Sequence, residues 1–149
     1  MKKILPALLL LLMAGLLAGC TIGINDDLPE QPVEFVMGNY VNPNDKEDSY
    51  GCVEYKGRIY VPCGTLRGTL RGKDVGACLG YLVRESDGKD EKVEDIRFFL
   101  LTGDSAEDLL VCLDKRRFMD QPIFFRAVDT AGEKIDYPKY IKPSDDLIW

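Results

Sequence analysis

The stretch that decides the fold is residues 51–64, GCVEYKGRIYVPCG, in which two apolar runs flank Lys56-Gly57-Arg58. Both runs are rich in β-branched and aromatic residues, which favour strands. A short interruption that contains glycine is typical of a hairpin turn. We therefore expect two antiparallel strands joined by a tight turn.

Two registers of this hairpin remain open. A three-residue loop at 56–58 places one set of apolar side chains on a single face and directs Cys52 and Cys63 to opposite faces; this set is Val53, Tyr55, Ile59 and Val61. A two-residue turn at Gly57-Arg58 sets Cys52 directly opposite Cys63. Because a slip of one residue moves every side chain to the other face, burial and this disulfide compete. Burial favours the first register slightly.

Short apolar segments separated by turn residues continue on both sides of the hairpin. Strands are expected at residues 77–84, 95–101 and 122–128, and residues 33–37 form a short apolar segment, whereas residues 109–113 fit either a buried strand or a short helix. This spacing predicts a mainly β domain over residues 33–149, with a small antiparallel sheet that is curled or forms a partly closed barrel. The alternative is an α+β domain with one short helix.

A tetrapeptide repeat follows the hairpin: Thr65-Leu66-Arg67-Gly68, then Thr69-Leu70-Arg71-Gly72, then Lys73. Glycine-rich loops can present backbone N–H groups to an anion, and arginine can grip a carboxylate or phosphate with two hydrogen bonds. Arg67, Arg71 and Lys73 are therefore a candidate anion- or ligand-binding site. The alternative is a solvated turn that pairs with the protein's own acidic residues.

The N-terminal segment has the pattern of a secretory signal. Lys2 and Lys3 precede an apolar run that is too short for a typical transmembrane helix and ends in Leu17-Ala18-Gly19-Cys20. This ending resembles the lipobox of bacterial lipoprotein precursors. The resemblance implies removal of signal peptide 1–19 and lipidation of Cys20. The polar, proline-containing residues 20–32 then form the lipidated cysteine and a flexible tether.

The same resemblance implies an extracytoplasmic protein that is attached to the cell membrane through diacylglycerol and acyl chains such as palmitate. Each buried methylene contributes about 0.8 kcal/mol, so two or three chains give durable attachment. Thr21 stands where an aspartate would retain such a protein at the inner membrane. If the cell has an outer membrane, that membrane is the expected destination.

Four cysteines remain when Cys20 is assigned to lipid: Cys52, Cys63, Cys78 and Cys112. An even number of cysteines in an exported chain suggests disulfides, although these cysteines leave the pairing undetermined. Alternatively, some of them are reduced residues of the core. Zinc is not expected, because no two of these cysteines are closely spaced and the chain has no histidine.

Charge and composition narrow the function classes. The net charge is −6, and it becomes −8 when Lys2 and Lys3 are removed with the signal peptide. An acidic body does not favour nucleic acid or a polybasic membrane contact. Without histidine and without a recognisable catalytic motif, enzymatic activity and a cofactor are not expected.

Two function classes remain for the domain. The first is a binding module for a small ligand or a neighbouring envelope protein. The second is an envelope-assembly subunit or a protective inhibitor. The hairpin Tyr55-Lys56-Gly57-Arg58-Ile59-Tyr60 resembles that of small uncharacterised lipoprotein domains, and this resemblance implies no particular activity.

Overall fold

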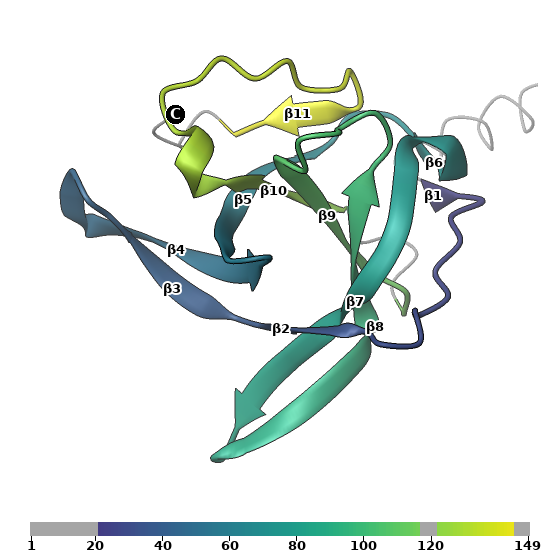
Figure 1. Cartoon of the computed structure of the whole chain (residues 1–149), viewed down its shortest axis with the longest axis horizontal. Helices are drawn as coiled ribbons and strands as arrows, with labels where there is room; N and C mark the ends of the chain where they lie inside the picture. Colours follow the sequence, from purple (N-terminus) through teal and green to yellow (C-terminus); the bar gives the residue numbers. More distant parts are fainter. Residues whose placement is uncertain (1–20, 117–121, 145–149) are drawn as a thin grey trace, which may run out of the picture.

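The computed structural model describes residues 21–116 and 122–144 (Figure 1). The expected signal peptide 1–19 and Cys20 lie outside the described residues. Two short 3₁₀ turns, η1 (Gly72–Asp74) and η2 (Val128–Thr130), accompany the strands. The strands are β1 (Thr21–Ile22), β2 (Val33–Val36), β3 (Gly38–Asn42), β4 (Asp45–Tyr55), β5 (Arg58–Leu66), β6 (Leu70–Arg71), β7 (Val75–Ser86), β8 (Lys89–Leu101), β9 (Leu109–Asp114), β10 (Ile123–Ala127) and β11 (Ile141–Pro143).

The main sheet has the order β2-β7-β8-β9-β10-β5-β4-β3, with β11 added beside β5. Only Met37 separates β2 from β3, so one extended segment belongs to both ends of the sheet and the sheet curls into a half-barrel (Figure 1). The predicted mainly β, curled architecture is confirmed. The sheet is mixed rather than wholly antiparallel, because β2 runs parallel to β7.

The structure contains no α-helix in the described part of the chain, and residues 109–113 belong to strand β9. The α+β alternative is therefore wrong for these residues. The described residues also contain no helical segment with the length and hydrophobicity needed to span a membrane.

The β4–β5 hairpin adopts neither predicted register. Val53 pairs with Tyr60 and Tyr55 with Arg58, so the turn consists of Lys56 and Gly57 alone. Both turn residues have positive φ, 51° and 74°, as a type I′ turn requires. Val53 and Tyr60 consequently share the buried face, whereas Ile59 lies on the opposite, more exposed face.

The central strands are buried on both faces, which explains their continuous apolar runs. Neighbouring residues such as Phe98 and Phe99 point into two different clusters. The inner cluster contains Phe98 with Phe35, Val53, Tyr60, Leu79, Leu82, Val93, Leu110, Phe125 and Ala127. The outer cluster contains Phe99 with Cys63, Leu66, Leu70, Val75, Leu101, Leu109, Val111, Phe124 and Ile141.

Part of the expected tether contacts the domain. Strand β1 pairs in parallel with β6, and Ile24 packs against the outer cluster. Asp26 also forms an ion pair of 2.8 Å with Lys115. An apolar side chain and a short ladder thus attach the residues after Cys20 to the domain. The polar composition of this segment predicts a flexible tether and does not indicate this attachment.

The four cysteines of the domain are free in the structure, contrary to the expected disulfides. Strand β8 lies between Cys78 and Cys112, and β10 lies between Cys63 and Cys112. Two strand spacings are about 9.6 Å, beyond the Cα separation of about 7 Å that a disulfide tolerates. Cys52 lies on β4 opposite Gly38, and the pairing of Val53 with Tyr60 offsets it from Cys63 on the neighbouring strand β5.

We predict that Cys52, Cys63, Cys78 and Cys112 all react with iodoacetamide in denaturant without reductant. In the folded protein, Cys63 and Cys112 should react slowest, because burial raises the pKa of each thiol to about 12 and keeps it protonated. Intact-mass spectrometry at successive times gives the count and the order. Recovery of only two alkylated sites after denaturation would instead show a disulfide.

Candidate functional site

The tip of the β4–β5 hairpin carries two cations, Lys56 and Arg58, on either side of Gly57. Gly57 adopts a left-handed conformation that suits glycine, and Lys56 shares this conformation at the first turn position. The turn places Lys56 at the tip and Arg58 at the start of β5. The structure therefore brings these cations to the loop that precedes β9 and to η2.

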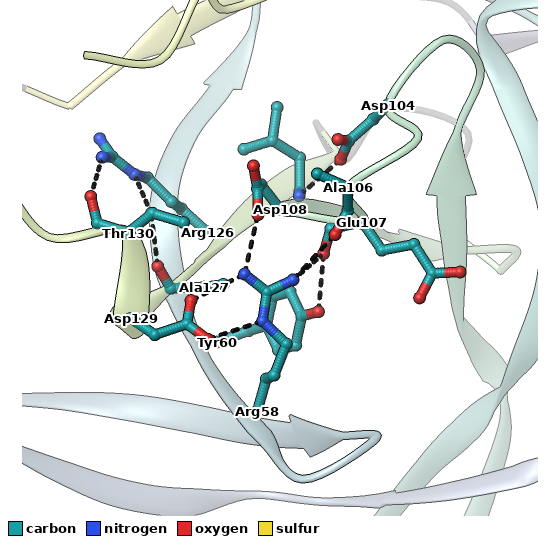
Figure 2. Close-up of polar contacts among 11 residues, drawn as sticks. Arg58, Tyr60, Asp104, Ala106, Glu107, Asp108, Arg126, Ala127, Asp129 and Thr130 are labelled. Atoms are coloured by element: carbon teal, nitrogen blue, oxygen red, sulfur yellow. Dashed lines mark hydrogen bonds and ion pairs between the residues drawn. The ribbon is translucent and has the colours of Figure 1, made fainter. Parts of the chain in front are cut away.

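Arg58 is the centre of a polar network that fastens this tip (Figure 2). Its guanidinium donates to both carboxylate oxygens of Asp129, at 2.8 and 2.7 Å, and to Asp108 Oδ1 at 2.7 Å. The remaining nitrogen donates to the carbonyls of Ala106 and Glu107 at 3.0 Å. Bidentate arginine contacts are directional, so this network fixes the hairpin against two distant loops.

Two further contacts extend the same attachment. The Tyr60 hydroxyl donates to the Glu107 carbonyl at 2.7 Å. Lys56 Nζ lies 2.8 Å from Glu107 Oε2 and 5.1 Å from the centre of the Tyr55 ring. Three side chains at alternate positions of the hairpin therefore contact the loop before β9: Lys56, Arg58 and Tyr60.

The ion pair between Arg58 and Asp129 should make the stability of the folded domain depend on pH. Arg58 lowers the pKa of Asp129 below its ordinary value of 3.8, so the ion pair stabilises the fold above that pH. The stabilisation is lost as the pH falls through the depressed pKa. Denaturant unfolding of Asp129→Asn should therefore show a smaller loss of stability between about pH 7 and pH 3 than the wild type.

Asp87→Asn, at the exposed turn between β7 and β8, is the matched control and should keep the wild-type pH profile. Equal acid sensitivity of the wild type and Asp129→Asn would show that the ion pair contributes nothing to stability.

A groove of about 500 Å³ lies beside this fixed tip, between β2 and the end of β4. We call it the β2–β4 groove. It is lined by Val33, Glu34, Val36, Glu54, Tyr55 and Lys56. Its volume falls in the range of about 300–1,000 Å³ that is typical of ligand sites.

The walls of the groove are held on both sides. On β2, Glu34 forms an ion pair of 2.8 Å with Lys92 and accepts a hydrogen bond of 2.9 Å from Tyr81. The hydrogen bond from Lys92 and then that from Tyr81 lower the pKa of Glu34. On β4, the Tyr55 ring packs 6.2 Å from the buried Phe35 ring. The groove is therefore largely preformed.

Glu54 differs from the other charged groups of the groove. Within residues 21–116 and 122–144, none of the ion pairs involves Glu54, whereas Glu34 and Lys56 are each paired. Its carboxylate lies on the exposed face, directly opposite Ile59 of β5. The groove therefore offers one available negative charge beside apolar surface.

A second pocket, of about 200 Å³, borders the Arg58 network at Asp108. It is acidic, with Asp104, Asp108 and Asp136 among its lining residues. Asp104 accepts a hydrogen bond from the Leu109 amide and Asp108 pairs with Arg58. In the described part of the chain, no group of potential ligand side chains could hold a metal ion.

The cations of the tetrapeptide repeat lie elsewhere. Arg67 follows β5, Arg71 ends β6 and Lys73 lies in η1, and all three side chains are exposed. None of them lines either pocket. Among the described residues, none of the ion pairs involves these three cations, so the alternative of self-pairing is not seen there either.

Glu54 and the partners of Arg58 carry no sequence pattern that marks them as site residues. The alternation of residues 51–64 identified the strands but not their register, which decides that Glu54 faces Ile59. The partners Asp108 and Asp129 lie 50 and 71 residues from Arg58, and the chain has 25 acidic residues. No sequence signal selects these two.

No protein-family model, curated protein or solved structure matches this chain.

Proposed function

We propose that this chain is an extracytoplasmic lipoprotein, anchored through Cys20, whose domain is a binding module that holds its ligand in the β2–β4 groove. The observation that carries the binding role is the groove itself, an open concave surface lined by three apolar or aromatic side chains and three charged ones, among them the carboxylate of Glu54. The anchor rests on Leu17-Ala18-Gly19-Cys20, which precedes the described residues.

Binding explains this site better than catalysis does. The chain has no histidine, the usual general base near neutral pH. Lys56 and Glu34 are engaged with partners that hold the walls in place. Rigid walls lower the conformational cost of binding without providing an activated nucleophile. The proposed anion site at Arg67, Arg71 and Lys73 stays a prediction of a second, separate contact.

The anchor is tested by the intact mass of the protein in the membrane fraction. We expect the wild type to lack residues 1–19 and to carry diacylglyceryl and acyl mass, and Cys20→Ser to carry none. A wild-type protein with the mass of the unmodified full chain would contradict the anchor.

The groove is tested by filling it. Val36 is 56% exposed, so Val36→Trp should fold normally and place an indole at the groove. Ile123→Trp, at a 44% exposed position on β10, is the matched control. After capture from envelope extract, the components bound by the wild type and the control should be absent from Val36→Trp. Equal capture by all three proteins would exclude the groove as the binding site.

A further inference from the structure

Two strand edges without ladder partners face the β2–β4 groove. Strand β2 is the last strand of the main sheet and pairs with β7 along one edge. The β3–β4 ladder ends at Gly38 and Cys52, and residues 53–55 of β4 pair only with β5 in the described structure. Figure 1 shows β3 and β4 side by side, with β2 and the end of β4 diverging.

Such edges are suited to an extended chain. An exposed strand edge presents backbone N–H and C=O groups in the pattern that a further strand pairs with. β2 offers four residues, Val33–Val36, and an extended segment rises about 3.3 Å per residue. Its four residues span about 13 Å, and because β2 also contacts β4, the part of this edge that is open to an added strand is shorter than that.

The side chains at the rim favour a basic residue in that segment. Ile59 lies directly opposite Glu54, so their side chains share one face about 5 Å apart. Val36 lines the same groove as Glu54, and Val36 and Ile59 are 56% and 40% exposed. A lysine or arginine can lay its aliphatic stem on such apolar surface while its cationic end reaches the carboxylate.

Charge also argues against a second copy of this chain as the occupant. The mature part carries a net charge of −8, and the projecting β3–β4 arm carries Asp45, Glu47 and Asp48. Insertion of that arm beside Glu54 would bring like charges together. A segment from a different, basic protein avoids this repulsion.

We propose that the β2–β4 groove binds an extended peptide segment bearing lysine or arginine, which adds as a strand along β2 and pairs its cation with Glu54. This inference rests on the proposed binding function and names the ligand class for the same groove. Main-chain hydrogen bonds supply the affinity, and Glu54 supplies the preference for a cation.

The test uses the full chain in detergent and a fluorescent peptide of about eight alternating valine and lysine residues, long enough to span β2. One control peptide replaces lysine with glutamate. A second keeps the side chains and carries N-methyl groups on alternate backbone amides. We expect anisotropy to show binding of the first peptide and about tenfold weaker binding of either control.

Two matched variants test the charge. Glu54→Gln should bind the valine–lysine peptide about tenfold more weakly than the wild type, because a charge-assisted contact is lost. Glu47→Gln removes a carboxylate from the exposed β3–β4 arm and should stay within about twofold of the wild type. Circular dichroism confirms that both variants are folded.

The outcomes separate this inference from the function on which it rests. Equal binding of the methylated and unmethylated peptides, or equal weakening by the two variants, would overturn strand addition at Glu54. If the peptide fails to bind while Val36→Trp still abolishes capture of an envelope component, the groove is a binding site for another ligand class. If Val36→Trp changes nothing, the proposed function itself fails.

Discussion

Replacing Phe98 with alanine is expected to lower the free energy of unfolding by about 3 to 5 kcal/mol. Phe98 is 1% exposed on β8, and its ring stacks 4.3 Å from Phe35 and lies 5.6 Å from Phe125. The close-packed inner cluster cannot collapse fully around the cavity, so both the transfer energy and the packing are lost. Denaturant unfolding monitored by circular dichroism measures the loss.

The neighbouring Phe99 tests the two-sided burial of the sheet. Phe99→Ala should cost a similar amount, about 3 to 5 kcal/mol, because this ring lies in the outer cluster. Ile123→Ala, at an exposed position, should change stability by only about 0.5 kcal/mol. A small effect of Phe99→Ala together with a large effect of Phe98→Ala would contradict a core on both faces.

The second large effect is expected at Arg126, which is 3% exposed. Its guanidinium donates to Thr130 Oγ1 at 2.8 Å, to the carbonyls of Thr130 and Glu133 at 2.7 and 2.9 Å, and to the Tyr137 hydroxyl at 3.2 Å. Arg126→Met keeps much of the volume but leaves these acceptors without their donor. Since a buried polar group left unpaired costs about 1–3 kcal/mol, we expect a total loss of about 3 kcal/mol.

The variant Arg126→Lys tests whether the positive charge alone, without the planar guanidinium, stabilises the domain. Lysine keeps the positive charge but cannot reach several acceptors with one planar group, so an intermediate loss of stability is expected. Because Arg126 holds Thr130, which follows Asp129 in η2, Arg126→Met should also weaken the Arg58 network (Figure 2). Unchanged unfolding of Arg126→Met would show that the buried contacts do not stabilise the domain.

The strands were predictable where burial imposes a pattern. The apolar runs at residues 95–101 and 122–128 identified parts of β8 and β10, because a strand covered on both faces is apolar throughout. The β7–β8 hairpin extends beyond the predicted strands at 77–84 and 95–101, through charged residues to Ser86 and Lys89. Side chains that face solvent on both sides carry no alternation that marks a strand.

The hairpin register depended on one backbone conformation. Lys56 has φ of 51°, an uncommon value for a residue other than glycine, asparagine or aspartate. The two predicted turns lie at 56–58 and 57–58, and the observed turn at 56–57 differs from both. This difference of one residue separates Cys52 from Cys63 and places Glu54 opposite Ile59.

The candidate groove could not be predicted from the sequence, because it arises from the order in which the strands pair. Its two walls come from β2 and from the end of β4, and they form a groove because β2 pairs with β7 while β3 pairs with β4. A parallel pairing between segments 47 residues apart, Val33 with Gly80, leaves no local pattern in the sequence. The cations of the repeat were conspicuous in an acidic chain, yet they lie outside both pockets.

The most direct test of the binding account is a map of the peptide contact on the ¹⁵N-labelled full chain. Titration with the valine–lysine peptide should shift the backbone amides of Val33–Val36 and of residues 54–56, with little change at the β7–β8 turn. Shifts centred on Arg67, Arg71 and Lys73, or spread evenly over the acidic surface, would contradict binding in the β2–β4 groove.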